Sequence, residues 1–403
     1  MLNYTYTAHN PSTGRKVSSD LQADSESAAV RLIQAEGLVP IDIKLDSKKA
    51  GGGRFSRVAS KDRVLFSRQL STLINAGLPL VQSLNNVNLQ TTNKMLRGVT
   101  SKVIADVEGG TTLSVSMSRH PKVFNKVYVS MVAAGEVSGT LDKSLERLAD
   151  QQEKDADIVA KVRGAMVYPL IVLFVMAIVM GFMLVKVLPQ VRVLYDGFPG
   201  ASLPLVTQVL LSLSAIVSKY WWILIIVLVI MSAVLGKWAR TGPGAEVIDL
   251  LKMRSPLIKS LFMKMYMARF SRTGSTLVAS GVPLIQMLEI TGEAVNNVHI
   301  ERSIGRAIEK VKGGKSLADA LDGDPNFLIL LPNMLRIGEQ SGSIEQMLGK
   351  TADYYEKEVD NEIKSVQTII EPVLMVVLGV VAFVIVAAVL LPVYSLAGKS
   401  FTV

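Results

Sequence analysis

Three apolar stretches stand out in a chain whose remaining sequence is largely amphipathic. Residues 164–185 and 372–398 contain no charged side chain, and each exceeds the roughly 20 residues that a helix needs to cross a hydrocarbon core. A third stretch, residues 220–236, is shorter and opens with Tyr-Trp-Trp, a sequence typical of a membrane interface. The pattern predicts transmembrane helices at residues 164–188, 216–236 and 371–393, and leaves open whether the apolar residues 203–217 are embedded.

Between the amino-terminal segment and the first apolar stretch, apolar residues recur at three- and four-residue spacing, as on one face of a helix. Glycine and proline interrupt this pattern at Gly77, Gly109-Gly110, Pro121 and Gly139. These breaks predict about six helices within residues 61–163, which is enough for a compact bundle.

The first 45 residues follow a different pattern. Residues 3–8 alternate as a strand does, residues 16–21 and 41–45 are strand-like, and Asp24 or Ser25 can cap a short helix that ends near Glu36. We therefore expect a small α/β module over residues 1–45. Residues 46–60 contain three consecutive glycines and several basic residues, which indicates a flexible linker, either a solvated tether or a contact with anionic lipid or an acidic partner.

The strongest signal is an internal repeat. Phe66-Ser67-Arg68 recurs as Phe270-Ser271-Arg272, 204 residues later. The same offset relates Gly77-x-Pro79 to Gly281-x-Pro283, Gly109-Gly110 to Gly313-Gly314, and Pro121 to Pro325. After one deletion the offset is 203, and it relates Phe124 to Phe327, Gly135-Glu136-x-Ser138-Gly139 to Gly338-Glu339-x-Ser341-Gly342, Pro169 to Pro372, and Leu188-Pro189 to Leu391-Pro392.

This register predicts one duplicated unit, a helical bundle followed by a membrane span. The fold class that we expect is an all-α membrane protein with two duplicated six-helix cytoplasmic bundles, three transmembrane helices and the small N-terminal α/β module. The second bundle then occupies residues 237–370. Leu70 is replaced by Gly274 in the second copy, which we expect to loosen one helix there.

Charge predicts the topology. The net charge is +9, and lysine and arginine concentrate before residue 164 and after residue 236, with few in between. Because cytoplasmic segments carry the excess of basic residues, we expect both bundles in the cytoplasm, and residues 189–215 and 394–403 outside. No basic stripe with interleaved aromatic residues favours nucleic acid as a partner.

Composition and motifs argue against several kinds of chemistry. The chain has no cysteine and three histidines, which are widely separated and have no metal-ligand spacing. Gly314-Lys315-Ser316 resembles the end of a phosphate-binding loop, but Glu309 stands where that loop requires glycine. We therefore expect no catalytic residue, no cofactor and no enzyme activity.

The repeated G-E-x-S-G motif has two interpretations. Gly135, Glu136 and Gly139, with their counterparts Gly338, Glu339 and Gly342, fall where the pattern predicts that one helix ends and the next begins. In the simpler interpretation the glycines permit positive φ and tight packing, and the glutamate forms a hydrogen bond or caps the next helix. In the alternative, the motif is a docking point for a partner.

An acidic run precedes the first and third apolar stretches. Glu153 and Asp157 share a helix face, and so do Glu356 and Asp360, because residues four apart align on a helix. A solvated acidic face is the simpler interpretation. The alternatives are a divalent metal ion shared between protomers, for which these four carboxylates are weak candidates, or a contact with a basic patch on a partner.

The order of the motifs carries a family resemblance. A small N-terminal module, and then F-S-R, G-x-P-L, G-G-x-x-L, G-E-x-S-G and a span near proline, twice over, resembles the GspF/PilC-type platform proteins of type II secretion and type IV pilus systems. The resemblance implies a multi-pass protein of the bacterial inner membrane whose N-terminus is cytoplasmic. It implies a platform that couples a cytoplasmic assembly ATPase to insertion of pilin or pseudopilin subunits into a growing fibre.

The same resemblance implies the partners. These are a hexameric cytoplasmic assembly ATPase, pilin or pseudopilin subunits, other inner-membrane assembly proteins, the lipid bilayer, and further copies of this chain in a homo-oligomer. The alternative function is a subunit of a duplicated membrane transporter, but the spans lack the midplane ionisable groups that transporters use. A lipid- or peptide-processing enzyme would need a convergent catalytic set, and the sequence shows none.

Overall fold

The fold is known from a computed structural model. It describes residues 2–9, 16–23, 30, 33–34, 39–45, 58–190, 193, 205–239, 241–256 and 258–400. The chain forms two compact units, which are taken separately below. One comprises Met1–Ala59 with Thr92–Gly98, and the other comprises Ser60–Thr91 with Val99–Val403.

The N-terminal unit contains a three-stranded antiparallel sheet. Its strands are β1 (Leu2–His9), β2 (Lys16–Ala23) and β3 (Val39–Leu45), in the order β2-β1-β3. β1 is central, since Tyr4 pairs with Leu21 of β2 on one side and with Leu45 of β3 on the other. The strands lie at the segments whose alternation predicted them. Most of the expected helix from Asp24 to Glu36, and residues 46–57 of the expected linker, lie outside the described residues.

The described secondary-structure elements of the second unit are helices. Its first half contains α2 (Ser60–Asn75), α3 (Leu80–Gln90), α5 (Leu113–Ser118), α6 (Lys126–Ser138), α7 (Leu141–Phe182) and most of α4 (Lys94–Glu108), whose first residues belong to the N-terminal unit. Aromatic rings fill the core, with the rings of Phe66 and Phe124 at 5.9 Å and those of Phe124 and Tyr128 at 4.9 Å. The side chains of all three residues are at most 2% exposed, so burial of their apolar surface stabilises the contact between α2 and α6.

The second half repeats this order. Its six helices are α11 (Lys259–Ala279), α12 (Leu284–Val295), α13 (Val298–Lys312), α14 (Leu317–Leu321), α15 (Leu330–Ser341) and α16 (Ile344–Ser400). The rings of Phe270 and Phe327, the counterparts of Phe66 and Phe124, meet edge to face at 5.7 Å. A further helix, α10 (Gly242–Arg254), precedes α11 and packs on it and on α13.

Glycine ends the equivalent helices with the same backbone geometry. Gly139 follows α6 with φ +68°, and Gly342 follows α15 with φ +66°. Side chains are strained in this left-handed region, which explains the glycine at both positions. Gly274 has a different role, because a Cβ there would lie 3.2 Å from Leu348 Cδ1. The replacement of Leu70 by Gly274 therefore permits close packing of α11 on α16, contrary to the expected loosening.

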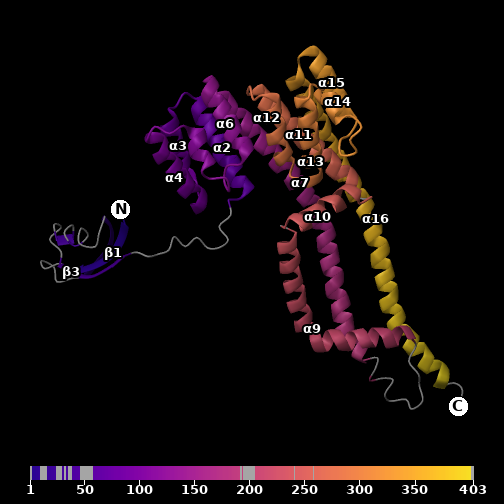
Figure 1. The fold of residues 1–403 in the computed structure, drawn as a ribbon. Coiled ribbons are helices and arrows are strands. Elements are labelled where there is room, and N and C mark those ends of the chain that lie inside the picture. Colours follow the sequence, from indigo (N-terminus) through magenta and orange to yellow (C-terminus); the bar gives the residue numbers. More distant parts are fainter. Residues whose placement is uncertain are drawn as a thin grey trace. The chain divides into compact units, whose positions relative to one another are not determined.

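The last helix of each half continues into the apolar segment without a break. α7 passes through Pro169 and is extended by a π-helical turn, η1 (Met183–Val187), while α16 is one helix of 57 residues. Among the described residues, two helices are long and apolar enough to cross a membrane, Leu141–Gln190 and Ile344–Ala387, and protein does not cover their apolar windows. The predicted boundaries at residues 163/164 and 370/371 thus fall inside continuous helices (Figure 1).

The middle apolar segment belongs to a bent helix, α9 (Leu205–Trp238). Its two arms, Gln208–Ile223 and Ile225–Trp238, differ in direction by 63°, and Tyr220 has non-helical φ and ψ of −119° and 17°. The bend lies at the Tyr-Trp-Trp sequence that the aromatic pattern assigned to an interface. The pair makes a third membrane-spanning candidate if both arms act as one span.

Candidate functional site: the ionic seam between the two halves

Each half contains the same arginine cluster. Arg68 on α2 donates from Nε and Nη2 to the two carboxylate oxygens of Glu153 on α7, at 2.7 and 2.6 Å. Its Nη2 also donates to Asp150 at 2.5 Å. Arg272 on α11 repeats this geometry on α16, with Glu356 at 2.7 and 2.9 Å and with Asp353. The F-S-R arginine therefore binds the acidic stripe of the long helix in both halves.

These contacts change the electrostatics of the carboxylates. The hydrogen bonds from Arg68 lower the pKa of the Glu153 carboxyl below its ordinary value. Glu153 lies in the polar, N-terminal part of α7, before the apolar segment. The carboxylate is thus kept ionised, and a paired arginine fork fixes its orientation.

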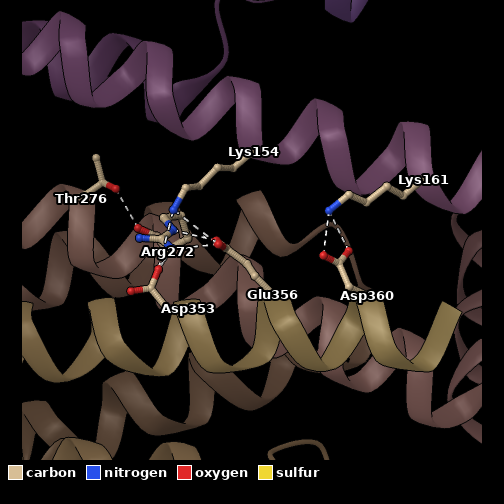
Figure 2. A network of polar contacts seen from close by, with 7 residues as sticks. All are labelled: Lys154, Lys161, Arg272, Thr276, Asp353, Glu356 and Asp360. Carbon is tan, nitrogen blue, oxygen red and sulfur yellow. Dashed lines mark hydrogen bonds and ion pairs between the residues drawn. The ribbon is translucent and has the colours of Figure 1, made fainter. Parts of the chain in front are cut away.

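Lysines from the first half complete the cluster in the second half. Lys154 on α7 lies 3.6 Å from Asp353 and 3.4 Å from Glu356, so it faces the Arg272 cluster (Figure 2). Two helical turns further on, Lys161 donates to both carboxylate oxygens of Asp360, at 2.8 and 2.7 Å. Figure 2 shows both lysines reaching from α7 to α16. The first half supplies cations here and the second half supplies anions.

Further polar contacts extend along the same boundary. Gln151 Nε2 donates to Thr273 Oγ1 at 2.8 Å, and Arg269 Nε lies 3.6 Å from Asp155. The Arg147 guanidinium donates to the carbonyl oxygen of Ala279, at the end of α11. On neighbouring helices, Lys126 of α6 pairs with Glu293 of α12. We call this set of contacts between the halves, together with the two lysines above, the ionic seam.

The seam joins two helices that lead into the apolar segments. α7 and α16 pack against each other, and α11 and α12 of the second half pack on α7 and α6. Ion pairs between half-exposed side chains contribute little each, but they fix register and orientation. The seam therefore fixes the orientation of one half relative to the other.

The motif glutamates cap a helix. Glu136 accepts from the backbone N–H of Leu113 at 2.5 Å and from that of Ser114 at 3.1 Å, at the start of α5. Glu339 accepts in the same way from Leu317 at 2.5 Å and Ala318 at 3.0 Å, at the start of α14. A carboxylate is favourable there because the first N–H groups of a helix lack intrahelical partners. Each glutamate lies inside α6 or α15 and caps the preceding short helix, whereas the sequence interpretation had it cap the next one.

The glycine before each glutamate permits a close helix approach. A Cβ at Gly135 would lie 2.7 Å from Ser144 Oγ and 3.1 Å from Leu141 Cα, both on α7. At Gly338 it would lie 3.0 Å from Ile344 Cα on α16. The G-G-x-x-L and G-E-x-S-G motifs thus belong to one structural feature, because the glutamate of the second motif accepts a hydrogen bond from the backbone N–H of the leucine of the first.

The acidic residues singled out in the sequence as candidates for metal or partner binding have different surroundings in the structure. Glu153 and Glu356 are bound by arginine, and Asp360 by Lys161. Asp157 is exposed and lines the groove beside Lys154 and Lys161, with no ion pair among the described residues. The described part of the chain contains no group of three or more histidine or acidic side chains placed to hold a metal ion.

The lysine of Gly314-Lys315-Ser316 lies in a turn. Gly314 has φ +90°, and Ser316 is the N-cap of α14, where its Oγ accepts from the Asp319 N–H at 3.1 Å. The three residues therefore connect α13 to α14, and the hydroxyl that a phosphate loop would use is the helix cap.

Sequence reasoning missed the arginines and the lysines of the seam. It identified F-S-R as a repeat marker and the acidic run as a solvated face, without joining them. A signal was present, since Arg68, Asp150 and Glu153 all recur in register as Arg272, Asp353 and Glu356. Opposite charges that are duplicated together are candidates for contact with each other.

Comparison with known proteins decides the family. A sequence model of the type II secretion system (T2SS) protein F matches twice, at residues 66–189 and 270–392, and a model of the N-terminal domain of type II secretion system protein F matches residues 1–44. Both matches to the first model begin at the F-S-R phenylalanine and end at the Leu-Pro proline. The chain belongs to the type II secretion system protein F family.

Relatives in this family carry two kinds of name. The chain is 37% identical over 406 residues to the type IV pilus assembly protein PilC of Thermus thermophilus, covering 98% of each chain. It is 35% identical to the PilC of Myxococcus xanthus, covering 96% of this chain and 93% of that one. It is 34% identical to the type II secretion system protein F of Pseudomonas aeruginosa, covering 98% and 99%. These identities extend over the sheet, both helical halves and the apolar segments of this family member.

Proposed function

We propose that this membrane protein is the inner-membrane platform of a type IV pilus or type II secretion machine. In this proposal it couples a cytoplasmic assembly ATPase to the insertion of pilin or pseudopilin subunits into a growing fibre. Support comes from the relatives, which are named for pilus assembly and for type II secretion. Relatives of both kinds align at similar identity over nearly the whole chain, so both machines stay within the proposal.

One structural observation carries the coupling. Each helical half ends in a helix that continues unbroken into an apolar segment, α7 in the first half and α16 in the second. A continuous helix transmits rotation and translation along its axis without a hinge. A force on the bundle surface therefore moves the apolar part of the same helix.

The proposed topology has three spans. Residues 164–188, 216–236 and 371–393 cross the inner membrane, the N-terminus and both six-helix bundles lie in the cytoplasm, and residues 189–215 and 394–403 lie outside. The charge asymmetry supports this arrangement. So does the topology of a duplicated unit, since two equivalent spans in one direction need a returning span between them.

In this proposal the platform protein catalyses no reaction. The ATPase is a separate subunit, and the platform needs neither a cofactor nor a catalytic residue. The G-E-x-S-G motifs and the acidic stripe act in the fold: Glu136 and Glu339 cap helices, and Glu153 and Glu356 bind arginine.

The test uses the full chain in its own cells. Deleting the gene should abolish surface fibres or secretion, and a tagged copy should restore them. Detergent extracts of the tagged copy should contain an assembly ATPase and a pilin or pseudopilin, which mass spectrometry would identify. Normal fibre assembly and secretion in cells that lack the chain would contradict the proposal. Uptake of a small solute by vesicles that contain the purified chain alone would also contradict it.

A further inference from the structure

The helix α10 exposes apolar side chains along one face. Val247 is 51% exposed and Leu251 is 65% exposed, and they lie one helical turn apart. Pro243, one turn before Val247, is exposed as well, so the three residues form an apolar stripe along the helix. The stripe ends beside the exposed Arg254. A helix at the surface of a water-soluble bundle normally turns such a stripe inward, toward the core.

The opposite face of α10 is bound to the bundle. Asp249 is only 6% exposed and accepts from the Val298 N–H at 3.2 Å, at the start of α13. Glu246 pairs with Arg302 of α13 at 2.5 Å, and the side chain of Met253 is buried. These contacts hold α10 in the orientation in which its apolar stripe faces away from the protein.

The start of α10 is attached to the end of α9. Thr241 donates from its backbone N–H and from Oγ1 to the carbonyl oxygen of Trp238, at 2.9 and 2.6 Å. Gly244 packs on the same carbonyl group, and a Cβ at this position would overlap it. Trp238 is the last residue of α9, so the apolar stripe begins next to the end of that helix.

The arm of α9 that ends at Trp238 is apolar on every side. The six consecutive residues 225–230 are all isoleucine, valine or leucine, and their side chains are 48–63% exposed. Since six consecutive residues point in all directions around a helix, protein covers no face of this part of the arm. A helix of this kind is surrounded by lipid. Lys237 and Trp238, at its end, are residue types that mark the edge of a membrane.

Three basic side chains lie around the apolar stripe in the sequence. Lys237 precedes the last residue of α9, Arg254 ends α10, and Lys259 begins α11. All three are exposed, and none forms an ion pair with a carboxylate within the part of the chain that the structure describes. An apolar helix face with lysine and arginine near it matches the surface of a bilayer that contains anionic lipids.

The repeat shows that the bundle fold does not need α10. At the offset of 204, its residues correspond to positions 38–50 of the first copy, where the strand β3 lies. The first half therefore forms its helices without an equivalent of α10. The additional helix lies between α9 and the bundle helices α11 and α13, which it contacts (Figure 1).

We propose that α10 is an interfacial helix whose apolar stripe lies in the bilayer surface, between the headgroups and the acyl chains. Lys237, Arg254 and Lys259 then bind the phosphates of anionic headgroups. The inference rests on the proposed topology, which places the end of α9 at the cytoplasmic surface of the membrane. It gives the second bundle an attachment to the bilayer beside α9, in addition to α16.

The absence of cysteine permits a direct test with an environment-sensitive fluorophore. Val247→Cys and Leu251→Cys are labelled with nitrobenzoxadiazole in the full chain, which is then reconstituted in vesicles. A lipid that carries a nitroxide near its headgroup should quench both labels strongly, and aqueous iodide should quench them weakly. Thermal unfolding in detergent checks that each variant keeps the fold.

Two control positions define the scale of quenching. Val137→Cys carries the label in water, because Val137 is 91% exposed and lies near the start of α7, roughly 35 Å along that helix before its apolar segment. Iodide should quench this label several-fold more than the labels on α10. Ile226→Cys places the label on the apolar arm of α9, where only the lipid nitroxide should quench it.

The role of the basic residues is measured on the Leu251→Cys label. Phosphatidylglycerol added to phosphatidylcholine vesicles should increase quenching by the nitroxide lipid. Arg254→Gln combined with Lys259→Gln should abolish that increase, because the anionic headgroups then lose two of their three cations. Lys143→Gln, which removes an exposed charge from the first half, should leave the increase unchanged.

Three results would overturn the inference. The α10 labels could respond to iodide as the label at position 137 does, which places α10 in water. Neither quencher could reach them, which indicates that protein covers the stripe. Phosphatidylglycerol could have no effect, which removes the anionic headgroups. Lipid quenching at position 226 shows in each case whether the arm of α9 lies in the membrane, so failure of α10 is distinguishable from failure of the proposed topology and function.

Discussion

Arg272 binds Glu356 through two hydrogen bonds, 2.7 Å from Nε and 2.9 Å from Nη2, and this pair lies where α11, α16 and the seam lysine Lys154 meet. Its counterpart, Arg68 with Glu153, has the same fork geometry without a lysine. The duplicated arginine cluster therefore holds two helices together in each half, and in the second half it also takes part in the contact between the halves.

Replacing Arg272 with methionine should destabilise the protein. The side chains of Arg272 and Glu356 are only 18% and 19% exposed, so the variant leaves carboxylates partly buried without their main partner. We expect a loss of about 1–3 kcal/mol, the size of a charged hydrogen-bond network. Thermal unfolding of detergent-purified protein measures it. Arg336→Met is the matched control, because Arg336 pairs with Asp319 and Asp322 at the surface, and an equal loss in that variant would contradict the argument.

Glu136→Ala should destabilise α5 specifically. The variant removes the acceptor of the Leu113 and Ser114 N–H groups, and loss of a helix cap costs about 1 kcal/mol. Hydrogen exchange at these two amides should accelerate more than exchange in α14, which Glu339 caps. A variant with unchanged exchange and stability that nonetheless fails to assemble fibres would favour the docking interpretation of the motif.

Gly135→Ala should also destabilise, for a steric reason. The new methyl group would lie 2.7 Å from Ser144 Oγ, so α6 and α7 must move apart. Overpacking of this kind costs about 1–3 kcal/mol. Gly305→Ala in α13 is the control, since nothing lies within 4 Å of its added Cβ, and alanine there should leave stability equal or higher. Equal unfolding midpoints for the two variants would refute the close approach of α6 and α7.

The sequence predicted the breaks between helices better than the contacts among them. Glycine and proline act locally through φ and the missing N–H, so Gly77, Gly139 and their counterparts could be placed from the sequence alone. A contact such as that of Arg68 with Glu153 joins residues 85 positions apart. The helical period shows which residues share a face, but it does not show which helix that face meets.

The same limit explains the two misplaced features. Glu136 was expected to cap the next helix because capping motifs are local, and its carboxylate instead reaches α5 through the tertiary fold. The first span was expected to begin at residue 164, where the charged residues end, yet α7 continues across that boundary and through Pro169. Loss of one backbone hydrogen bond is tolerated in a helix of this length.

Acid should weaken the first cluster. Hydrogen bonds from Arg68 lower the pKa of Glu153 in the folded protein, so its contribution to stability is complete above its ordinary value of 4.5 and is lost as the pH falls through the folded-state pKa. As the pH is lowered below 4.5, the unfolding temperature of the unmodified chain should therefore decrease more steeply than that of Arg68→Met. Lys143→Met removes an exposed positive charge and should keep the steep dependence. The same dependence of the unfolding temperature on pH in all three proteins would contradict a stabilising role of the pair between Arg68 and Glu153.

In the proposed function, the bundles drive the membrane segments through continuous helices. Four glycines inserted between Arg163 and Gly164 interrupt α7 at the edge of the apolar segment, whereas four alanines add the same length and keep the helix. The measurement is the amount of surface fibre or secreted substrate, with membrane abundance and ATPase co-purification recorded for both variants. The glycine insertion should abolish assembly while the ATPase still binds, and the alanine insertion should retain a large part of the assembly. Equal assembly by the two variants would contradict mechanical coupling through α7.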